Sequence, residues 1–215
     1  MMKVFVTGAT GETGQRIVQE LVKRNIAVKA LVRNLEKAKI LPSEVELVVG
    51  DVLKPDALSD ALDDCTVLIC ASGAKPPFNL TVPFRVDFQG SNNLVNLAKS
   101  KGIEHFVLVS SLCVSRFFHP LNLFGLILFW KSKAEKYLQK SGLTYTIVRP
   151  GGLKNEDNSD GIIMSKQDTL FTGRIPRQKV AFIAVESLFH PEAKNQIIEI
   201  IAQPDTPNTT WEQFV

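Results

Sequence analysis

Three glycines spaced three residues apart follow the first apolar segment of the chain, and this spacing suits phosphate binding. Gly8, Gly11 and Gly14 stand after the β-branched run Lys3–Thr7 and before Glu12–Lys23, which has helical spacing. The first glycine permits a tight turn, the second lets the backbone approach a pyrophosphate, and the third lets the helix pack close to the sheet. The N–H groups of the first helical turn and the helix dipole then hold the phosphates, so we expect a dinucleotide here. The expected contacts are Gly8, Thr10, Gly11, Glu12, Thr13 and Gly14.

The end of the second expected strand carries a cation where an NAD-selective site usually carries an acid. An Asp or Glu there accepts hydrogen bonds from the ribose 2′-hydroxyl of NAD. In Leu31-Val32-Arg33-Asn34 the position holds Arg33, whose guanidinium can form paired, charged hydrogen bonds with a 2′-phosphate. Arg16 or Lys37 could add a second cation. We therefore predict NADP(H) as the cofactor; the alternative is that Arg33 is a solvated surface residue.

Strand and helix patterns alternate along the chain, which predicts a parallel sheet covered by helices on both faces. The expected strands are 3–7, 28–32, 45–49, 67–70, 106–109, 145–148 and 197–202. The expected helices are 12–23, 86–101, 131–140 and 180–189, and 155–161 is expected as a polar loop. At 215 residues the chain suits one domain. We predict an α/β, doubly wound parallel sheet (Rossmann fold) over 1–215, with a small C-terminal substrate lobe built mainly from 112–130 and 151–180.

Composition argues against several classes of protein. The net charge of +3 is small and the cations are scattered, so nucleic-acid binding is not expected. Cys65, Cys70 and Cys113 match neither a zinc site nor a CxxC pair and are expected to be reduced and buried; the three histidines are too scattered for a metal site. The uncharged stretch 117–130 is shorter than the roughly 20 apolar residues of a membrane span. Without signal-peptide anatomy, we expect a cytoplasmic protein, or a stromal one if a plastid transit peptide was removed.

The Gly-x-x-Gly-x-x-Gly spacing resembles that of the short-chain dehydrogenase/reductase superfamily, and almost the whole chain is similar to its atypical, extended-type branch. Gly50-Asp51-Val52, Ala71-Ser72-Gly73 and Arg149-Pro150-Gly151 carry the resemblance further. It implies that Asp51 lies near the adenine amino group, that the second segment passes over the cofactor, and that the third turns beside the nicotinamide. The cofactor-binding residues implied in this way are Asp51, Val52, Ala71, Ser72, Gly73, Pro150 and Gly151.

The chain departs from this superfamily where a Tyr-x-x-x-Lys pair usually reduces carbonyls. The best candidate for the lysine is Lys131, and four residues before it stands Ile127. If Lys133 is the aligned lysine, the residue four positions before it, where the tyrosine is expected, is Phe129. Neither side chain can transfer a proton. The two tyrosines follow both lysines at the wrong spacing: Tyr137 and Tyr145. An ordinary alcohol dehydrogenase mechanism is therefore not expected.

Without a tyrosine to donate a proton, the chemical class of acceptor that could be reduced is restricted. Hydride addition to a simple ketone makes a basic alkoxide, so a positioned acid contributes roughly 10²–10⁴-fold there. Hydride addition to a flavin, bilin or quinone makes a delocalised, weakly basic anion that solvent can protonate, so proximity alone can suffice. We expect such a planar conjugated molecule as the acceptor.

Two serines and one lysine are the candidate catalytic residues. Ser111, and then Ser110, end the fifth expected strand, at the sheet edge where ligands bind in such folds. Either hydroxyl could orient the acceptor or a water; the alternative is a serine that caps the strand and bonds the cofactor amide. Lys131 could bond the nicotinamide ribose, and the alternative is a solvated helix lysine.

Two groups of relatives share the missing tyrosine, and the chain is similar to both. One is the biliverdin-IXβ reductase/flavin reductase group, through the glycine loop, the Leu-Val-Arg segment, Gly50-Asp51-Val52 and the serine pair. The other is the plastid and cyanobacterial group of translocon-associated NADP-binding proteins. Its resemblance rests on Leu121-Asn122-Leu123-Phe124-Gly125-Leu126, Lys133-Ala134-Glu135-Lys136-Tyr137 and the run 141–155. This second match is the closer and implies a cyanobacterial or plastid lineage.

The uncharged stretch 117–130 has three readings: it lines a pocket for a planar acceptor, it docks on a protein partner or a membrane surface, or it is core and lid. Pro76-Pro77-Phe78 could form the opposite pocket wall. His119 is a minor candidate for an unrecognised acid. Two hypotheses for the function follow. The first is an NADPH-dependent reductase of a flavin, bilin or quinone-like acceptor, and the second is a catalytically idle NADP(H)-binding module that senses redox state and docks elsewhere.

Overall fold

One sheet runs through the protein, whose computed structural model describes residues 2–73 and 81–214. Its strands are β1 (Lys3–Thr7), β2 (Ala27–Val32), β3 (Glu46–Val49), β4 (Val67–Cys70), β5 (His105–Val109), β6 (Tyr145–Pro150), β7 (Gly152–Lys154), β8 (Gly161–Lys166), β9 (Arg174–Pro176) and β10 (Gln196–Gln203). The α-helices are α1 (Glu12–Lys23), α2 (Leu35–Ala38), α3 (Ser91–Ser100), α4 (Ile127–Gln139), α5 (Arg177–Glu186) and α6 (Trp211–Phe214). Short helical turns are η1 (Pro55–Leu58), η2 (Asp60–Leu62), η3 (Phe84–Gly90), η4 (Pro120–Leu123) and η5 (Pro191–Ala193).

The strand order confirms the doubly wound parallel sheet. The strands follow each other as β3-β2-β1-β4-β5-β6-β10-β9-β7, with β8 also paired to β10. The first seven in this order are parallel to their neighbours. The order reverses between β1 and β4, and in such sheets the crevice outside the carboxyl ends at this reversal holds the ligand. The glycine loop follows β1 and therefore lies at this crevice.

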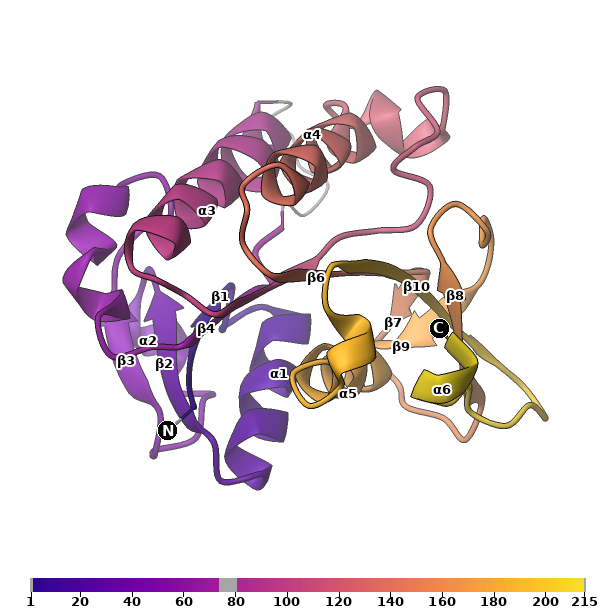
Figure 1. Ribbon diagram of the computed structural model, residues 1–215, viewed down its shortest axis with the longest axis horizontal. Helices are drawn as coiled ribbons and strands as arrows, with labels where there is room; N and C mark the ends of the chain where they lie inside the picture. Colours follow the sequence, from indigo (N-terminus) through magenta and orange to yellow (C-terminus); the bar gives the residue numbers. More distant parts are fainter. Residues whose placement is uncertain (1, 74–80, 215) are drawn as a thin grey trace.

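Helices cover both faces of the sheet (Figure 1): α3 and α4 lie on one side, α1 and α5 on the other. Strand β1 shows how the sequence produces two cores, because successive side chains of a strand point to opposite faces. Val4 and Val6 belong to the core beneath α1, which contains Ile17, whereas Phe5 belongs to the core beneath α3, which contains Leu94. Strands buried on both faces account for the unbroken apolar runs of the sequence.

Several expected boundaries are wrong. The helix expected over 86–101 is instead a π-helical turn, η3, followed by α3, which ends at Ser100. The helix expected over 180–189 is α5, which starts directly after Pro176, where the fixed φ of −58° ends β9. The helix expected over 131–140 begins four residues earlier, at Ile127. Apolar spacing predicts the centre of a helix better than its first and last residues. All of these errors therefore concern the ends of helices.

Three strands between 152 and 176 were not expected. They are β7, β8 and β9, and they extend the same sheet beyond β10. Strand β8 runs antiparallel to β10 along its whole length, with Met164 opposite Ile200. Gly161, the last residue of the expected polar loop 155–161, is the first residue of β8. Much of the segment 151–180, expected as part of a substrate lobe, is therefore continuous with the main sheet.

Candidate functional site

The glycine loop has the close packing that its spacing predicts. Gly8 has a φ of +71°, and its carbonyl accepts a 2.9 Å hydrogen bond from the Gly11 N–H. A Cβ on Gly14 would lie 2.1 Å from the Gly8 oxygen, so only glycine lets α1 start this close to β1. The N-cap residue of α1 is Gly11, which has no side chain that could cap the helix. The loop and this uncapped helix end can therefore accept phosphate oxygens.

A cavity of about 490 Å³ lies directly against this loop. Its lining brings together many residues that were predicted from four separate stretches of sequence. The predicted residues in the lining are Gly8, Thr10, Gly11, Arg33, Asp51, Val52, Ala71, Ser72 and Gly73. The remaining lining residues are Leu31, Lys37, Leu53, Val82 and Val86. Glu12, Thr13 and Gly14 form the first turn of α1 behind the loop and are not among the lining residues.

Two cations stand in the cavity wall, and local structure places both. Arg33 follows the end of β2, and the Asn34 side chain accepts a 2.7 Å hydrogen bond from the Glu36 N–H, which starts α2. That short helix brings Lys37 to the same wall as Arg33. Arg16, the other candidate second cation, instead donates to the Glu12 carboxylate at 3.0 Å. The residues thus fit a dinucleotide with an extra phosphate at the β2 end.

The opposite wall is held by hydrogen bonds within the chain. The Asp51 carboxylate accepts a 2.9 Å hydrogen bond from the Leu53 N–H, and Asn93 on α3 donates to the Val52 carbonyl at 3.0 Å. The Ser72 hydroxyl donates to the Thr7 hydroxyl at 3.0 Å, which ties the end of β4 to the end of β1. The wall is therefore fixed by bonds within the chain.

Ser110 follows the last residue of β5, and its hydroxyl proton is already used in a hydrogen bond. Its hydroxyl donates to the Glu135 carboxylate on α4, and both side chains are buried. Only its lone pairs are left to face a ligand, so Ser110 can accept but not donate there. Ser111 is half-buried, and its hydroxyl has no hydrogen-bond partner among the described residues. Of the two, Ser111 keeps a proton that a ligand could accept.

Lys131 lies beneath the loop after β4, paired with a residue that sequence reasoning missed. Its ammonium is 2.8 Å from the buried Asp87 carboxylate on η3, and a Cβ on Gly73 would lie 3.6 Å from both groups. A small space lined by Ser72, Ser110 and other residues adjoins the pair. Burial alone would lower the pKa of Lys131, but the adjacent Asp87 carboxylate raises it above its ordinary value. Lys131 is therefore a fixed cation rather than a proton donor.

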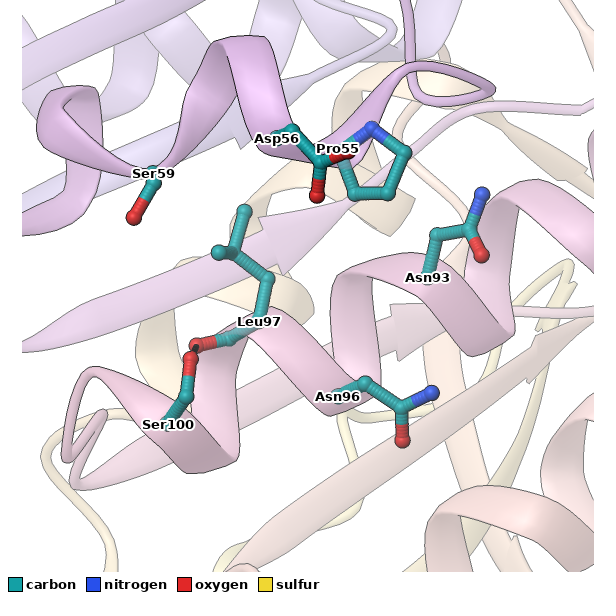
Figure 2. Close-up of a pocket in the computed structure, with 7 residues that line it drawn as sticks. All are labelled: Pro55, Asp56, Ser59, Asn93, Asn96, Leu97 and Ser100. Carbon is teal, nitrogen blue, oxygen red and sulfur yellow. Dashed lines mark hydrogen bonds between the residues drawn. The ribbon is translucent and has the colours of Figure 1, made fainter.

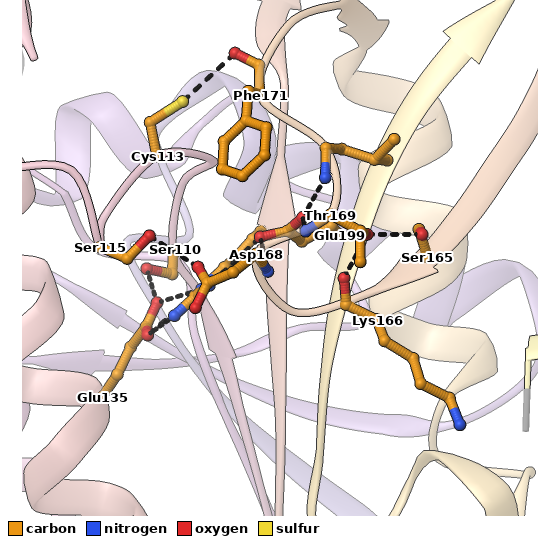
Figure 3. A network of polar contacts seen from close by, with 12 residues as sticks. Ser110, Cys113, Ser115, Glu135, Ser165, Lys166, Asp168, Thr169, Phe171 and Glu199 are labelled. Carbon is orange, nitrogen blue, oxygen red and sulfur yellow. Dashed lines mark hydrogen bonds and ion pairs between the residues drawn. The ribbon is translucent and has the colours of Figure 1, made fainter.

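A second set of residues missed from the sequence surrounds Arg149; Figure 3 labels its acidic members, Glu135, Asp168 and Glu199. Its guanidinium contacts Glu135 at 2.7 Å, Asp168 at 2.9 Å and Glu199 at 3.2 Å. Glu199 also accepts from the backbone N–H groups of three consecutive residues at 2.7–3.0 Å, namely Asp168, Thr169 and Leu170. Burial would lower the pKa of Arg149, and its acidic neighbours raise it instead. Through Glu135 this network reaches Ser110. The sequence signal was limited to Arg149 and Glu199, each of which stands within an apolar run.

Pro150 and Gly151, expected beside the nicotinamide, lie at the junction of three strands. The Gly151 N–H donates to the Ile200 carbonyl at 2.9 Å, and a Cβ on Gly151 would lie 2.7 Å from the Gly173 oxygen. Neither residue is among those that line the 490 Å³ cavity. Their expected contact with a cofactor stays a prediction. Pro76-Pro77-Phe78, the expected opposite wall, lies outside the described residues.

Neither tyrosine is positioned to act as the missing acid. The Tyr137 hydroxyl donates to Asn96 on α3 at 2.7 Å, far along α4 from its first residue, Ile127. Tyr145 is the first residue of β6 and so lies at the edge of the sheet opposite the glycine loop. Ile127 itself is buried and apolar. His119 accepts the Leu121 N–H at 3.2 Å and caps η4.

A groove between η1 and α3 is a different kind of site (Figure 2). It measures about 380 Å³ and is lined by Pro55, Asp56, Ser59, Asn93, Asn96, Leu97 and Ser100. Its amides and hydroxyls are largely engaged within the chain: Asn93 bonds Val52, Asn96 bonds Tyr137, and Ser100 bonds the Leu97 carbonyl. It shares no lining residue with the cavity at the glycine loop.

Within the described ranges, no group of His, Cys, Asp or Glu could hold a metal ion. All three cysteines are free and buried, as expected. None of the helices in residues 2–73 and 81–214 is long and apolar enough to cross a bilayer.

Comparison with known proteins places the chain among dinucleotide-binding proteins. A family model described as NAD(P)H-binding matches residues 8–191. An uncharacterized chloroplastic protein of Arabidopsis thaliana is 45% identical, over 99% of this chain and 81% of its own length. The chloroplastic protein TIC 62 of Pisum sativum is 37% identical over 99% of this chain, which spans only 45% of that protein. Sanguinarine reductase of Eschscholzia californica is 30% identical, over 99% of this chain and 93% of its own length.

Solved structures agree on the fold. A protein of Bacillus halodurans described as a putative NAD-dependent epimerase/dehydratase superposes with a TM-score of 0.86 at 28% identity, covering 96% of both chains. ChuY, an anaerobillin reductase of Escherichia coli O157:H7, superposes with a TM-score of 0.81 at 24% identity, covering 97% of this chain and 100% of the other. At that identity the second likeness concerns the fold alone. The resemblance to atypical short-chain dehydrogenases/reductases is confirmed.

Proposed function

This chain belongs to the NAD(P)H-binding family, and on that premise we propose that it is an NADPH-dependent reductase of a planar conjugated acceptor such as a flavin, a bilin or a quinone. The observation that carries the proposal is a cavity against the glycine loop whose lining includes neither Tyr137 nor Tyr145. The relative named a reductase, which aligns over nearly the whole chain, adds support for this class of reaction.

The two cations in the cavity wall support NADP(H) over NAD(H). Arg33 and Lys37 can neutralise a 2′-phosphate, and the end of β2 offers no carboxylate for a free 2′-hydroxyl. Gly8 and Gly11 would bind the pyrophosphate, and Asp51 would contact the adenine. Ser72 and Gly73 would contact the part of the cofactor that lies between these two groups and the nicotinamide. Pro150 and Gly151 remain proposed nicotinamide neighbours.

The proposed chemistry needs positioning more than acid catalysis. When bound, NADPH supplies a hydride, so that acceptor, NADPH and one solvent proton give reduced acceptor and NADP⁺. Lys131, fixed by Asp87, would bind the nicotinamide ribose. Ser111 would orient the acceptor, and Ser110, whose proton is committed to Glu135, would accept a hydrogen bond from the ligand. Because a delocalised product anion is weakly basic, that one proton can come from water.

The test is to mix the protein with NADPH and FMN, riboflavin, biliverdin or a quinone, and to follow nicotinamide absorbance. We expect turnover above roughly 1 s⁻¹ with at least one acceptor, within the usual range of enzymes. Tyr137→Phe and Tyr145→Phe should each retain it. A loss of about 10²-fold or more in either variant would show that a tyrosine is the acid after all.

The second candidate function is a catalytically idle module that binds NADP(H) and docks on another component. The exposed apolar side chains of 117–126 favour it, because such a cluster usually marks an interaction site. Tight NADPH binding without turnover on any acceptor would select this function. For the compartment, we propose the cytoplasm or a plastid stroma, since relatives carry the description chloroplastic and the buried free thiols suit a reducing environment.

A further inference from the structure

A line of three buried side chains fixes the hydroxyl of Ser110. This hydroxyl donates to Oε1 of Glu135 (Figure 3), and Nε of Arg149 donates to the same oxygen at 3.1 Å. Oε2 of Glu135 accepts from Nη2 of Arg149 at 2.7 Å. The exposed fractions are 7% for Ser110, 2% for Glu135 and 5% for Arg149. Water therefore has little access to these hydrogen bonds.

The direction of the Ser110 hydrogen bond follows from these contacts. A guanidinium has five N–H donors and no acceptor. Because Arg149 donates to both carboxylate oxygens of Glu135, neither oxygen has a proton to give, and Ser110 is the donor. The backbone N–H of Ser110 is also used, since it donates to the Val148 carbonyl at 2.7 Å. Only the lone pairs of the Ser110 hydroxyl oxygen are left for a ligand.

These lone pairs lie beside the cofactor cavity. The small space next to Ser110 is also lined by Ser72, Asp87 and Lys131. Ser72 belongs to the lining of the cavity at the glycine loop as well, so the two spaces adjoin. The Ser72 hydroxyl proton is committed too, because it is donated to Thr7 at 3.0 Å. At this junction an N–H group finds two hydroxyl oxygens that accept, whereas a carbonyl oxygen faces their lone pairs.

We propose that Glu135 is a positioning residue that makes Ser110 accept hydrogen bonds only, so that this end of β5 selects a ligand with an N–H group. The inference rests on the proposed function and adds to it the chemistry that the ligand must carry. Two groups can supply the N–H: the carboxamide of the nicotinamide, or a pyrrole or lactam of the acceptor. A quinone, which has carbonyl oxygens and no N–H, is disfavoured.

The variant Glu135→Gln should reverse the polarity of Ser110. The guanidinium of Arg149 is closer to Oε2, at 2.7 Å, than to Oε1, at 3.1 Å, so the amide oxygen takes the Oε2 position. The amide NH2 then points to Ser110, which accepts from it, and the hydroxyl proton becomes free to point to the ligand. A ligand with a carbonyl and no N–H should therefore bind more tightly to this variant, a gain that damage to the fold would not produce.

The test is calorimetric binding of two matched pairs of ligands to the full chain. The first pair is NADP⁺ and its 3-acetylpyridine analogue, in which an acetyl group replaces the carboxamide. The second pair is biliverdin and menadione, titrated into the NADP⁺ complex; menadione has no N–H. In one pair, we expect Glu135→Gln to raise the affinity for the analogue or for menadione by about 5- to 10-fold, and to change the other member little. The pair that responds identifies the source of the N–H group.

A second variant, Ser110→Ala, removes the accepting oxygen. It should weaken the N–H member of the same pair by about 5- to 10-fold, and Glu135→Gln should have no further effect in that background. The matched control is Glu199→Gln, which removes a different carboxylate from the Arg149 guanidinium and should leave both preferences unchanged. The thermal midpoint shows whether each variant is folded, and Ser110→Ala decides alone if Glu135→Gln is not.

The proposal is overturned if neither pair responds to Glu135→Gln. It is also overturned if Ser110→Ala weakens both members of a pair equally, which would make Ser110 a structural cap of the strand. Because binding is measured instead of turnover, the outcome is separate from that of the reductase test. Preferences of the expected kind in a chain that reduces no acceptor would support this inference and contradict the reductase.

Discussion

Arg33 is the residue on which cofactor choice depends, and its effect can be isolated. We expect Arg33→Ala to weaken NADP(H) by about 10- to 150-fold, because a charged, paired hydrogen bond to the 2′-phosphate is lost. NAD(H) affinity should change little. Titration of both cofactors by calorimetry measures this. Lys39→Ala is the control, since Lys39 is exposed near the same helix and pairs with Glu36 at 2.6 Å. Equal losses for both cofactors would contradict the assignment.

The Asp87–Lys131 pair should behave as a unit. Asp87→Asn leaves a buried lysine without its counter-ion, and breaking such a pair costs about 3–5 kcal/mol of unfolding free energy. We expect Lys131→Met to be similarly costly and Asp87→Asn/Lys131→Met to recover much of the loss. Denaturant unfolding of the four proteins gives the coupling energy. Additive losses would show that the two side chains act independently.

Sequence reasoning found the residues whose spacing is local and missed those whose partners are distant. Gly8, Gly11 and Gly14 belong to one turn, so their spacing alone predicts the loop. Asp87 and Lys131 are far apart in the sequence and meet only because η3 packs on α4. The proton of Ser110 could not be assigned for the same reason: its acceptor, Glu135, comes from another element.

Among the elements, β5 carries a titratable group at its first residue. Thr146 on β6 donates its proton to the Ala193 carbonyl at 2.7 Å, so the 2.9 Å bond from His105 to Thr146 uses the imidazole N–H. Burial, followed by the charge of Lys194, lowers the pKa of His105 to about 4. The folded protein therefore holds this histidine neutral at pH values where the unfolded chain would protonate it.

This predicts a pH-dependent stability. The unfolded histidine titrates near 6.5 and the folded one near 4, so the unfolded state binds the extra proton between these values. Stability should fall by about 3 kcal/mol as pH drops through that window, and no further change from this group is expected below it. Denaturant unfolding of the natural chain and of His105→Gln at several pH values measures this. An unchanged slope in the variant would assign the effect to other groups.

Among the strands, the sequence predicts the long buried ones and does not predict the short ones at the edge of the sheet. Strands β1, β4 and β5 are continuous apolar runs, so their existence follows from composition. Strands β7 and β9 have three residues each and depend on their partners in the sheet. The π-helical turn η3 could not be predicted either, because the apolar spacing of its residues fits an α-helix nearly as well as a π-helix.

For the whole molecule, the Arg149 network joins parts that the chain order separates. Glu135 comes from α4, Arg149 from β6, Glu199 from β10 and Asp168 from the turn after β8. The buried Arg149 guanidinium therefore links α4, in the helical layer formed by α3 and α4, to strand β10 and the turn after β8. Glu199 fixes the turn directly through its three backbone bonds.

We expect Glu199→Gln to release that turn. The variant should lose about 3 kcal/mol of unfolding free energy, because Arg149 and the backbone donors lose a charged acceptor. The amides of 168–170 should exchange with solvent faster, as followed by hydrogen-exchange mass spectrometry. Glu104→Gln, at an exposed position, should change neither quantity. Unchanged protection of 168–170 would mean that the turn is held by other contacts.

Helix α4 carries Lys131 and Glu135 one helical turn apart. The first pairs with Asp87 beside the cofactor cavity, and the second joins Ser110 to the Arg149 network. A shift of this helix would therefore move both side chains together. Linkage then requires reciprocity: whatever factor a rearrangement of the Arg149 network applies to NADPH affinity, NADPH applies to that rearrangement. The stability of the turn after β8 thereby becomes a readout of nucleotide occupancy.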